Sequence, residues 1–241
     1  MDQITQEIAN TYNSLLLTNP SHKALLRKVK SGKATALDAD RFALINGKAL
    51  SKAMSLHLTD EISAAEYKRI VAEVMPLGLG SVYGKVGPYA LAYQKTANKQ
   101  MGVALQAIEA KYNTEAANAI VTEALKGETY SAVSGAIQGE VCHFAQNIVT
   151  DTMKANAAAA EDAGLEVYVT RIYDGVGLHD GKDECKFCTS RCFEDVPYDE
   201  ALAKDMFRRH VGCQCEIRYR VGNKTQRQSY WEHNKWSDYN G

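Results

Sequence analysis

The residues best suited to chemistry in this sequence are cysteines gathered near its C-terminal end. Five of the six cysteines lie in one short stretch, Cys185, Cys188, Cys192, Cys213 and Cys215, with His210 just ahead of the last pair. The chain begins Met-Asp-Gln-Ile-Thr-Gln-Glu, which has no features of a secretory signal. We therefore expect the protein to be made in a reducing compartment, where its cysteines stay as thiols. In such a compartment, clustered cysteines indicate a metal site more than a set of disulfides.

The spacing of these residues suits zinc. A Cys-x-x-Cys turn, here Cys185 to Cys188, directs two thiolates at one ion, and a distant second group completes a tetrahedron. That second group is the run from His210 to Cys215, in which Gly212 allows the backbone to turn tightly. Five candidates therefore compete for four positions, and the sequence does not separate them: Cys185, Cys188, His210, Cys213 and Cys215.

The expected role of this zinc is structural. Four protein ligands leave no open position for water, so the ion would act as a staple and not as a catalyst. A C-terminal module of this size has a small core and gains most from a staple. We interpret Cys192 as a thiol in the core or at the rim of the module, and Cys142 lies apart from the cluster. The alternative for the whole cluster is a set of reduced cysteines packed as small apolar side chains.

The elements that position this cluster follow a long helical region. Helix starts are predicted by Asn19-Pro20, by the capping-box spacing of Thr35 with Asp38 and of Ser63 with Glu66, and by Asn113. Apolar residues at helical spacing predict one helix over 129–161, the longest in the chain. Its Gly135 and Gly139 indicate either close packing or two tolerated glycines. The glycines and flanking prolines of 78–87 predict a loop between helices.

The hydrophobic period changes after Gly164. Residues 165–173 are β-branched and aromatic, and residues 213–221 alternate, with Cys213 and Cys215 on the apolar face and Glu216 on the polar one. The sequence therefore predicts an α+β protein: a helical body over 1–163 and a zinc-stapled α+β module over 164–241.

Charge excludes some classes of function and leaves others open. The chain has 28 Lys and Arg against 29 Asp and Glu, a net charge of −1, which excludes a polybasic nucleic-acid coat. A local basic patch with interleaved Tyr230, Trp231 and Trp236 could still contact phosphate or stack on bases, or its aromatics could pack the tail onto the module. The candidate nucleic-acid contacts are Arg208, Arg209, Arg218, Arg220, Lys224 and Arg227.

Two broad classes are not expected. No apolar stretch approaches the roughly 20 residues of a membrane span, so we expect a soluble protein with no membrane partner. The motifs of zinc deaminases, His-Glu-x-x-His proteases, P-loop proteins and dinucleotide-binding proteins do not occur, so we expect no enzyme.

The C-terminal third resembles a known family. The run Asp183-Glu-Cys185-Lys-Phe-Cys188, followed after about twenty residues by Met206-Phe-Arg-Arg-His210-Val-Gly-Cys213-Gln-Cys215, is similar to the signature of Mu-F-like head morphogenesis proteins, the minor head proteins of tailed phages. The basic stretch and Trp-containing tail that follow resemble the branch found in phages of Gram-positive bacteria. The specific part covers residues 168–236, and Cys192 departs from the usual pattern.

This resemblance implies a virion component and no established enzymatic activity. It implies association with the portal protein, and with major capsid or scaffold protein, inside the head or at its portal vertex, after assembly in the host cytoplasm. Members are thought to assist capsid assembly and the packaging or ejection of viral DNA. The helical body would then dock on the portal or inner shell, and the basic face would touch packaged DNA.

Two hypotheses from other classes stay open. The cluster could belong to a zinc-stapled nucleic-acid-binding module with a helical oligomerisation arm, or to a hydrolase or nuclease without a recognisable motif. Duplex DNA binding without portal protein would favour the first, and metal-dependent DNA cleavage would favour the second.

Overall fold

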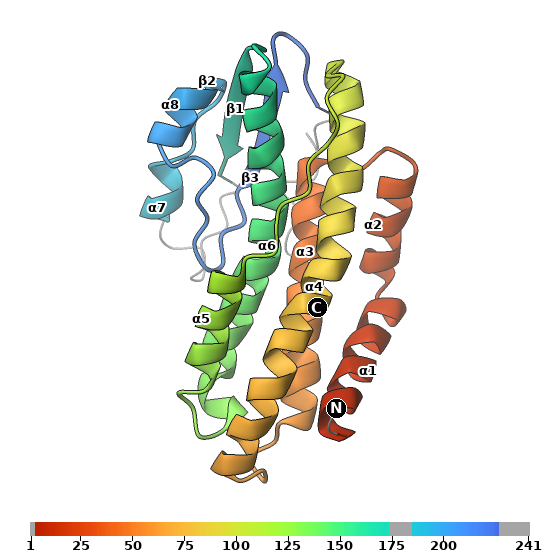
Figure 1. The fold of residues 1–241 in the computed structure, drawn as a ribbon, viewed down its shortest axis with the longest axis vertical. Helices are drawn as coiled ribbons and strands as arrows, with labels where there is room; N and C mark the ends of the chain where they lie inside the picture. Colours follow the sequence, from red (N-terminus) through yellow and green to blue (C-terminus); the bar gives the residue numbers. More distant parts are fainter. Residues whose placement is uncertain (1–2, 174–184, 227–241) are drawn as a thin grey trace.

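The computed structural model describes residues 3–173 and 185–226 of the chain (Figure 1). Six helices come first: α1 (Gln3–Thr18), α2 (Pro20–Lys30), α3 (Ala36–His57), α4 (Ala64–Met101), α5 (Thr114–Ala124) and α6 (Tyr130–Asp162). A smaller region follows with β1 (Val167–Ile172), α7 (Lys186–Thr189), β2 (Val196–Pro197), α8 (Tyr198–Ala203) and β3 (Glu216–Val221). The predicted α+β class is confirmed.

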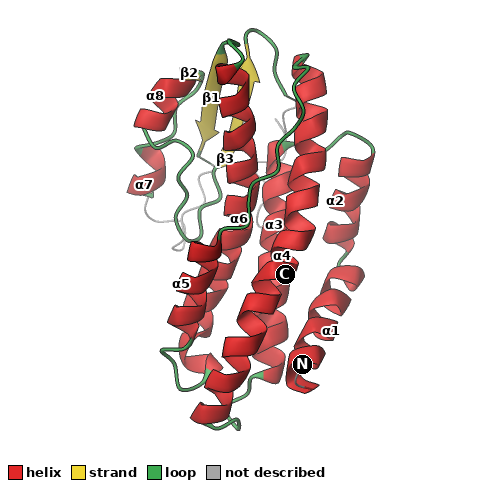
Figure 2. Cartoon of the chain, viewed as in Figure 1, coloured by secondary structure: helices red, strands yellow, loops and turns green. Residues whose placement is uncertain are grey.

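The long helices form an elongated bundle that carries the sheet at one side. Helix α3 packs along α6, and α1 and α4 pack against α3. Helix α5 lies beside one half of α6, and the sheet with α7 and α8 lies beside the other half (Figures 1 and 2). None of the described helices has an apolar stretch of the length that crossing a membrane requires.

The helix starts lie where local capping chemistry placed them. Asn19 accepts a hydrogen bond from the His22 amide at 2.9 Å, and Thr35 and Asp38 form a reciprocal capping box. Ser63 and Asn113 also cap α4 and α5 through their side chains. Helix α6 matches the predicted span to within a residue at each end.

The loop predicted over 78–87 is wrong. These residues lie inside α4, which has 38 residues and contains Pro76 and Pro88, so α4 and not α6 is the longest helix. A Cβ on Gly78 would lie 2.9 Å from Leu50 Cδ1, so this glycine lets α3 approach closely. Burial of the helix against α3 and α6 therefore outweighs the roughly 1 kcal/mol that each glycine costs.

The sheet is antiparallel with β1 in the centre, in the order β2-β1-β3. The chain leaves α6 through Gly164, whose φ of 77° is in the left-handed region. Strand β3 begins only at Glu216, and its Ile217 and Tyr219 are buried as predicted. Glu216 was expected on a solvated face but is fully buried, because α3 and α6 also pack against this strand.

One hydrophobic core runs through both parts of the chain. Val169, Phe207 and Ile217 of the smaller region belong to the same buried cluster as Phe42 and Val149 of the helices. The smaller region is therefore built onto α3 and α6, and tests of its function require the full chain.

Candidate metal centre

The two halves of the cysteine cluster are presented by short local structures. Cys185 caps the single-turn helix α7, and its carbonyl accepts a hydrogen bond from the Thr189 amide at 2.9 Å. In the second half, the Cys213 amide donates to the His210 carbonyl at 3.0 Å, and Gly212 has a φ of 77°. The tight turn expected at Gly212 is therefore present, and it folds the His210–Cys215 run back on itself.

All five predicted ligands converge on one place. His210 Nε2 lies 3.3 Å from Cys185 Sγ and 3.0 Å from Cys188 Sγ, and Cys188 Sγ lies 3.8 Å from Cys213 Sγ. Ligand atoms within each of two groups lie within 4.8 Å of one another, and both groups contain Cys188: one adds Cys185 and His210, the other Cys213 and Cys215. In tetrahedral zinc the donor atoms are about 3.8 Å apart for two sulfurs and about 3.5 Å apart for sulfur and nitrogen, so the arrangement suits a metal ion.

The backbone contact of His210 favours the tautomer that a ligand needs. Its Nδ1 lies 2.7 Å from the Val211 carbonyl oxygen, and only a protonated Nδ1 can donate there. The lone pair of Nε2 is then free and faces the two sulfurs. This hydrogen bond is the outer-shell contact that orients metal-binding histidines in general. On α6, Gly139 makes room for the same turn, since a Cβ there would lie 2.6 Å from Val211 Cγ1.

A buried arginine of β1 contacts the sulfurs directly. Arg171 is 1% exposed, and its Nη2 lies 3.4 Å from Cys213 Sγ and 3.7 Å from Cys188 Sγ. Its Nη1 donates to the carbonyls of Met206 and Arg208, which lead into His210. A guanidinium beside sulfur favours the thiolate, the form that binds metal. Arg171 is not among the site residues predicted from the sequence, although its alternation with Val167 and Val169 places it on the buried face of β1.

Arg209 was predicted to contact nucleic acid, and the structure corrects this. Its side chain is fully buried and its Nη2 lies 2.6 Å from Asp40 Oδ2 of α3. Its Nε donates to Thr150 Oγ1 of α6 at 2.7 Å, and its Nη1 donates to the Cys215 carbonyl at 2.9 Å. Arg209 therefore ties the ligand-bearing turn to two helices of the body and presents no charge at the surface. Asp40 is likewise not among the site residues predicted from the sequence.

The burial of these groups shifts their pKa values. Burial raises the pKa of Asp40 to about 7, although Arg209 acts in the opposite direction. The pKa of Cys213 is lowered because its sulfur accepts hydrogen bonds from Cys188 and Cys215. The contact with Cys213 raises the pKa of Cys188, and the contacts with Cys188 and Cys213 raise the pKa of Cys215. Metal binding here would therefore displace thiol protons and weaken as the pH falls.

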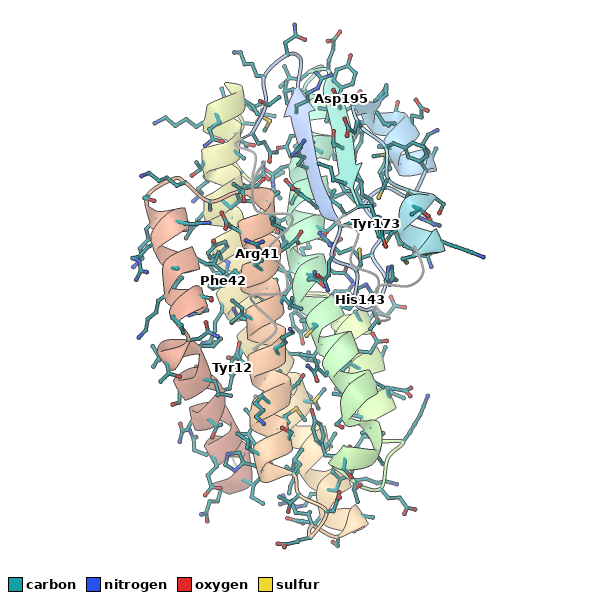
Figure 3. All side chains as sticks on the ribbon, turned by 180° about the vertical axis from the view of Figure 1, so that it is seen from behind. Tyr12, Arg41, Phe42, His143, Tyr173 and Asp195 are labelled. Carbon is teal, nitrogen blue, oxygen red and sulfur yellow. The ribbon has the colours of Figure 1, made fainter. Side chains whose placement is uncertain are left out.

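The other predicted basic residues do not form a free cationic surface in the part of the chain described. Arg218 Nη1 lies 3.3 Å from Glu216 Oε1. Arg220 Nε lies 2.7 Å from Oδ1 of Asp195, which is labelled in Figure 3. Arg208 is exposed and lies 3.5 Å from Asp205. Lys224 is exposed, whereas Arg227 and the aromatic residues Tyr230, Trp231 and Trp236 lie outside the described residues.

The two remaining cysteines have different surroundings. Cys192 is half-buried at the rim of the cluster, as expected, and its Sγ lies 4.0 Å from Cys215 Sγ. Cys142 is buried on α6 against Gly47 of α3, where a Cβ on the glycine would lie 2.8 Å from Cys142 Cα. Cys142 therefore contributes to helix packing.

The arrangement as a whole is a buried thiol and imidazole cluster that could hold a metal ion. It joins α7 to the turn before β3, and Tyr173 closes one side, where its hydroxyl accepts a hydrogen bond from the Cys185 amide (Figure 3). No family model, curated protein or solved structure matches this chain.

Proposed function

We propose that this chain is a structural zinc protein of a tailed-phage head, which holds other head components and does not catalyse a reaction. The observation that carries the zinc assignment is the meeting of His210 Nε2 with the sulfurs of Cys185 and Cys188 beside Cys213. Thiolate and imidazole ligands in a tetrahedral arrangement are typical of zinc.

The surroundings favour a structural role for the ion. Cys188 and Cys213 are 2% and 1% exposed, so a bound ion would be covered by its own ligands. Arg209 and Gln146 hold the ligand-bearing turn on α3 and α6, the latter through a 3.0 Å hydrogen bond to the Cys213 carbonyl. Zinc would therefore fix the smaller region to the helical body.

The phage-head assignment rests on the resemblance of the C-terminal signature. The elongated helical body fits the proposal, because it offers long outer faces to partners such as the portal, major capsid or scaffold protein. Leu17, Leu56 and Leu77 are at least half exposed on α1, α3 and α4. In this proposal the protein resides in the virion, inside the head or at its portal vertex.

Metal analysis tests the zinc part of the proposal. Full-length protein purified without chelator should contain about one zinc per chain, and Cys188→Ala should lose both the zinc and much of the thermal stability. Cys142→Ala is the matched control, because it removes a buried thiol outside the cluster and should keep the zinc. If Cys188→Ala retained full zinc and its melting temperature, the zinc assignment would fail.

Association with the portal protein tests the phage part. The full chain and the portal protein encoded in the same genome should form a complex that survives size-exclusion chromatography at moderate salt. A chain that ignores portal protein but binds duplex DNA in a salt-dependent way would favour the nucleic-acid-binding alternative. The pairing of Arg218 and Arg220 with carboxylates, and the burial of Arg209, argue against that alternative.

A further inference from the structure

The cluster contains more sulfur than one zinc ion can use. A structural zinc ion takes four ligands, and the described residues bring five candidate donors together with a further thiol, Cys192, at their edge. At least one candidate donor is therefore left over when zinc is bound. This reasoning rests on the proposed zinc site.

The contacts indicate which four donors hold the ion. The ligand atoms of Cys185, Cys188 and His210 lie within 4.8 Å of one another, so these three can contact one ion. Cys213 lies 3.8 Å from Cys188, close to the sulfur–sulfur spacing of a zinc tetrahedron, which is about 3.8 Å. Both buried guanidiniums also point to Cys213, at 3.4 Å from Arg171 and 3.9 Å from Arg209, as expected for a metal-bound thiolate.

Cys215 is then the spare thiol, and its sulfur faces Cys192 at 4.0 Å. Both cysteines stand next to residues that are fixed on β1. The Arg171 amide donates to the carbonyl of Phe193 at 2.8 Å, and Glu216 pairs with Ile172 in the sheet. The backbone therefore holds the two cysteines in place. A disulfide then requires side-chain rotations that shorten the Sγ–Sγ distance from 4.0 Å to about 2.05 Å.

We propose that Cys192 and Cys215 form a disulfide when the protein meets a peroxide, while Cys185, Cys188, His210 and Cys213 keep the zinc. Cys192 is half-buried and Cys215 is 1% exposed, so peroxide reaches Cys192 first. Cys215 is the resolving thiol.

The reaction is balanced with hydrogen peroxide as the oxidant. The Cys192 thiolate attacks one peroxide oxygen, an S–O bond forms, the O–O bond breaks, and hydroxide leaves and takes up the thiol proton as water. The Cys215 thiolate then attacks the sulfenic sulfur, an S–S bond forms, and the sulfenic oxygen leaves as a second water. Two thiols lose two electrons and two protons, and one peroxide becomes two waters.

The expected consequence is a second crosslink around the metal. The disulfide would join the segment after α7 to the start of β3, the same two segments that zinc connects. In a virion, the bond would form after release from the reducing host cytoplasm. It would keep the module closed in an environment where thiolate ligands are themselves at risk of oxidation.

The test uses reduced, zinc-loaded full-length protein treated with one equivalent of hydrogen peroxide. Intact mass should fall by two hydrogens, non-reducing peptide mapping should join the peptides containing Cys192 and Cys215, and a zinc-sensitive dye should detect no released metal. Cys192→Ser should abolish the crosslink and keep the zinc, whereas Cys142→Ser should behave as the parent. Cys215→Ser should also keep its zinc, and Cys213→Ser should lose it.

The failures of the two proposals can be told apart. A crosslink between Cys188 and Cys213, or zinc release in step with oxidation, would overturn the inference but not the assignment of zinc to the reduced protein. Loss of zinc from Cys215→Ser would do the same. A reduced chain without bound zinc would overturn both proposals. The mapping on the parent protein decides the matter even where a variant fails to fold.

Discussion

Replacing Arg171 should destabilise the protein far more than replacing an arginine on the neighbouring strand. Arg171 on β1 donates to the buried carbonyl of Met206, to the part-buried carbonyl of Arg208 and to two sulfurs. Arg171→Met keeps much of the apolar stem but leaves both carbonyls without this donor. A buried polar group without a partner costs about 1–3 kcal/mol, so two such carbonyls would cost about 2–6 kcal/mol. Because the Arg208 carbonyl is part-buried, we expect a loss in the lower half of that range.

The zinc site should weaken at the same time. Arg171 contacts the proposed ligands Cys188 and Cys213, and removal of an outer-shell partner typically reduces metal affinity by about 10- to 100-fold. Competition with a chromogenic chelator measures this affinity, and chemical denaturation of the zinc-loaded protein measures the free energy of unfolding.

Arg220→Met is the matched control on β3. Arg220 contacts a carboxylate and no sulfur, its side chain is 21% exposed and its partner Asp195 is 56% exposed. The loss should therefore be at most about 1 kcal/mol, with no change in zinc affinity. If Arg171→Met cost no more than Arg220→Met and bound zinc equally well, the role assigned to Arg171 would be refuted.

Three further outcomes are expected. Burial raises the pKa of Asp40 from 3.8 to about 7, so the protonated side chain stabilises the fold at low pH and this contribution is lost as the pH rises from about 4 to about 7. The free energy of unfolding of the parent relative to Asp40→Asn should fall over that window by up to about 4 kcal/mol, as measured by chemical denaturation at each pH. Gly47→Ala should cost about 1–3 kcal/mol, since its Cβ would meet the backbone of Cys142, whereas Gly80→Ala, with open space around its Cβ, should be neutral or stabilising in thermal melts. Acidification to about pH 5 should release zinc as the thiolates are protonated, which equilibrium dialysis detects, and the melting temperature should fall with it.

Local chemistry explains which parts of the fold were predictable from the sequence. Thr35 and Asp38 are three residues apart and satisfy each other's amides, so the start of α3 needs no information from elsewhere. The same holds for Cys185 and Cys188, whose spacing alone brings two sulfurs to one side of a turn. Such features are encoded within a few residues.

Tertiary contacts explain what the sequence could not show. Gly78 and Pro88 have the composition of a loop, yet α4 continues through them because its buried face packs on α3 and α6. Asp40 and Arg209 are separated by 169 positions, and nothing local marks either as the partner of the other. Burial of Glu216 depends in the same way on helices that pack against β3 from far along the chain.

The two adjacent arginines before His210 show how one motif serves both the surface and the metal centre. Arg208 has a side chain that is 64% exposed, whereas the side chain of Arg209 is fully buried. Three thiolates and one imidazole around zinc carry a net charge of −1. Above about pH 7, where Asp40 is ionised, Arg171, Arg209 and Asp40 together add +1, so the buried group is then electrically neutral with three thiolates. A fourth ionised sulfur would leave a buried negative charge without compensation, which is costly in a low-dielectric interior. The charges that touch the cluster therefore favour the same ligand set as the distances, with one cysteine left as a neutral thiol.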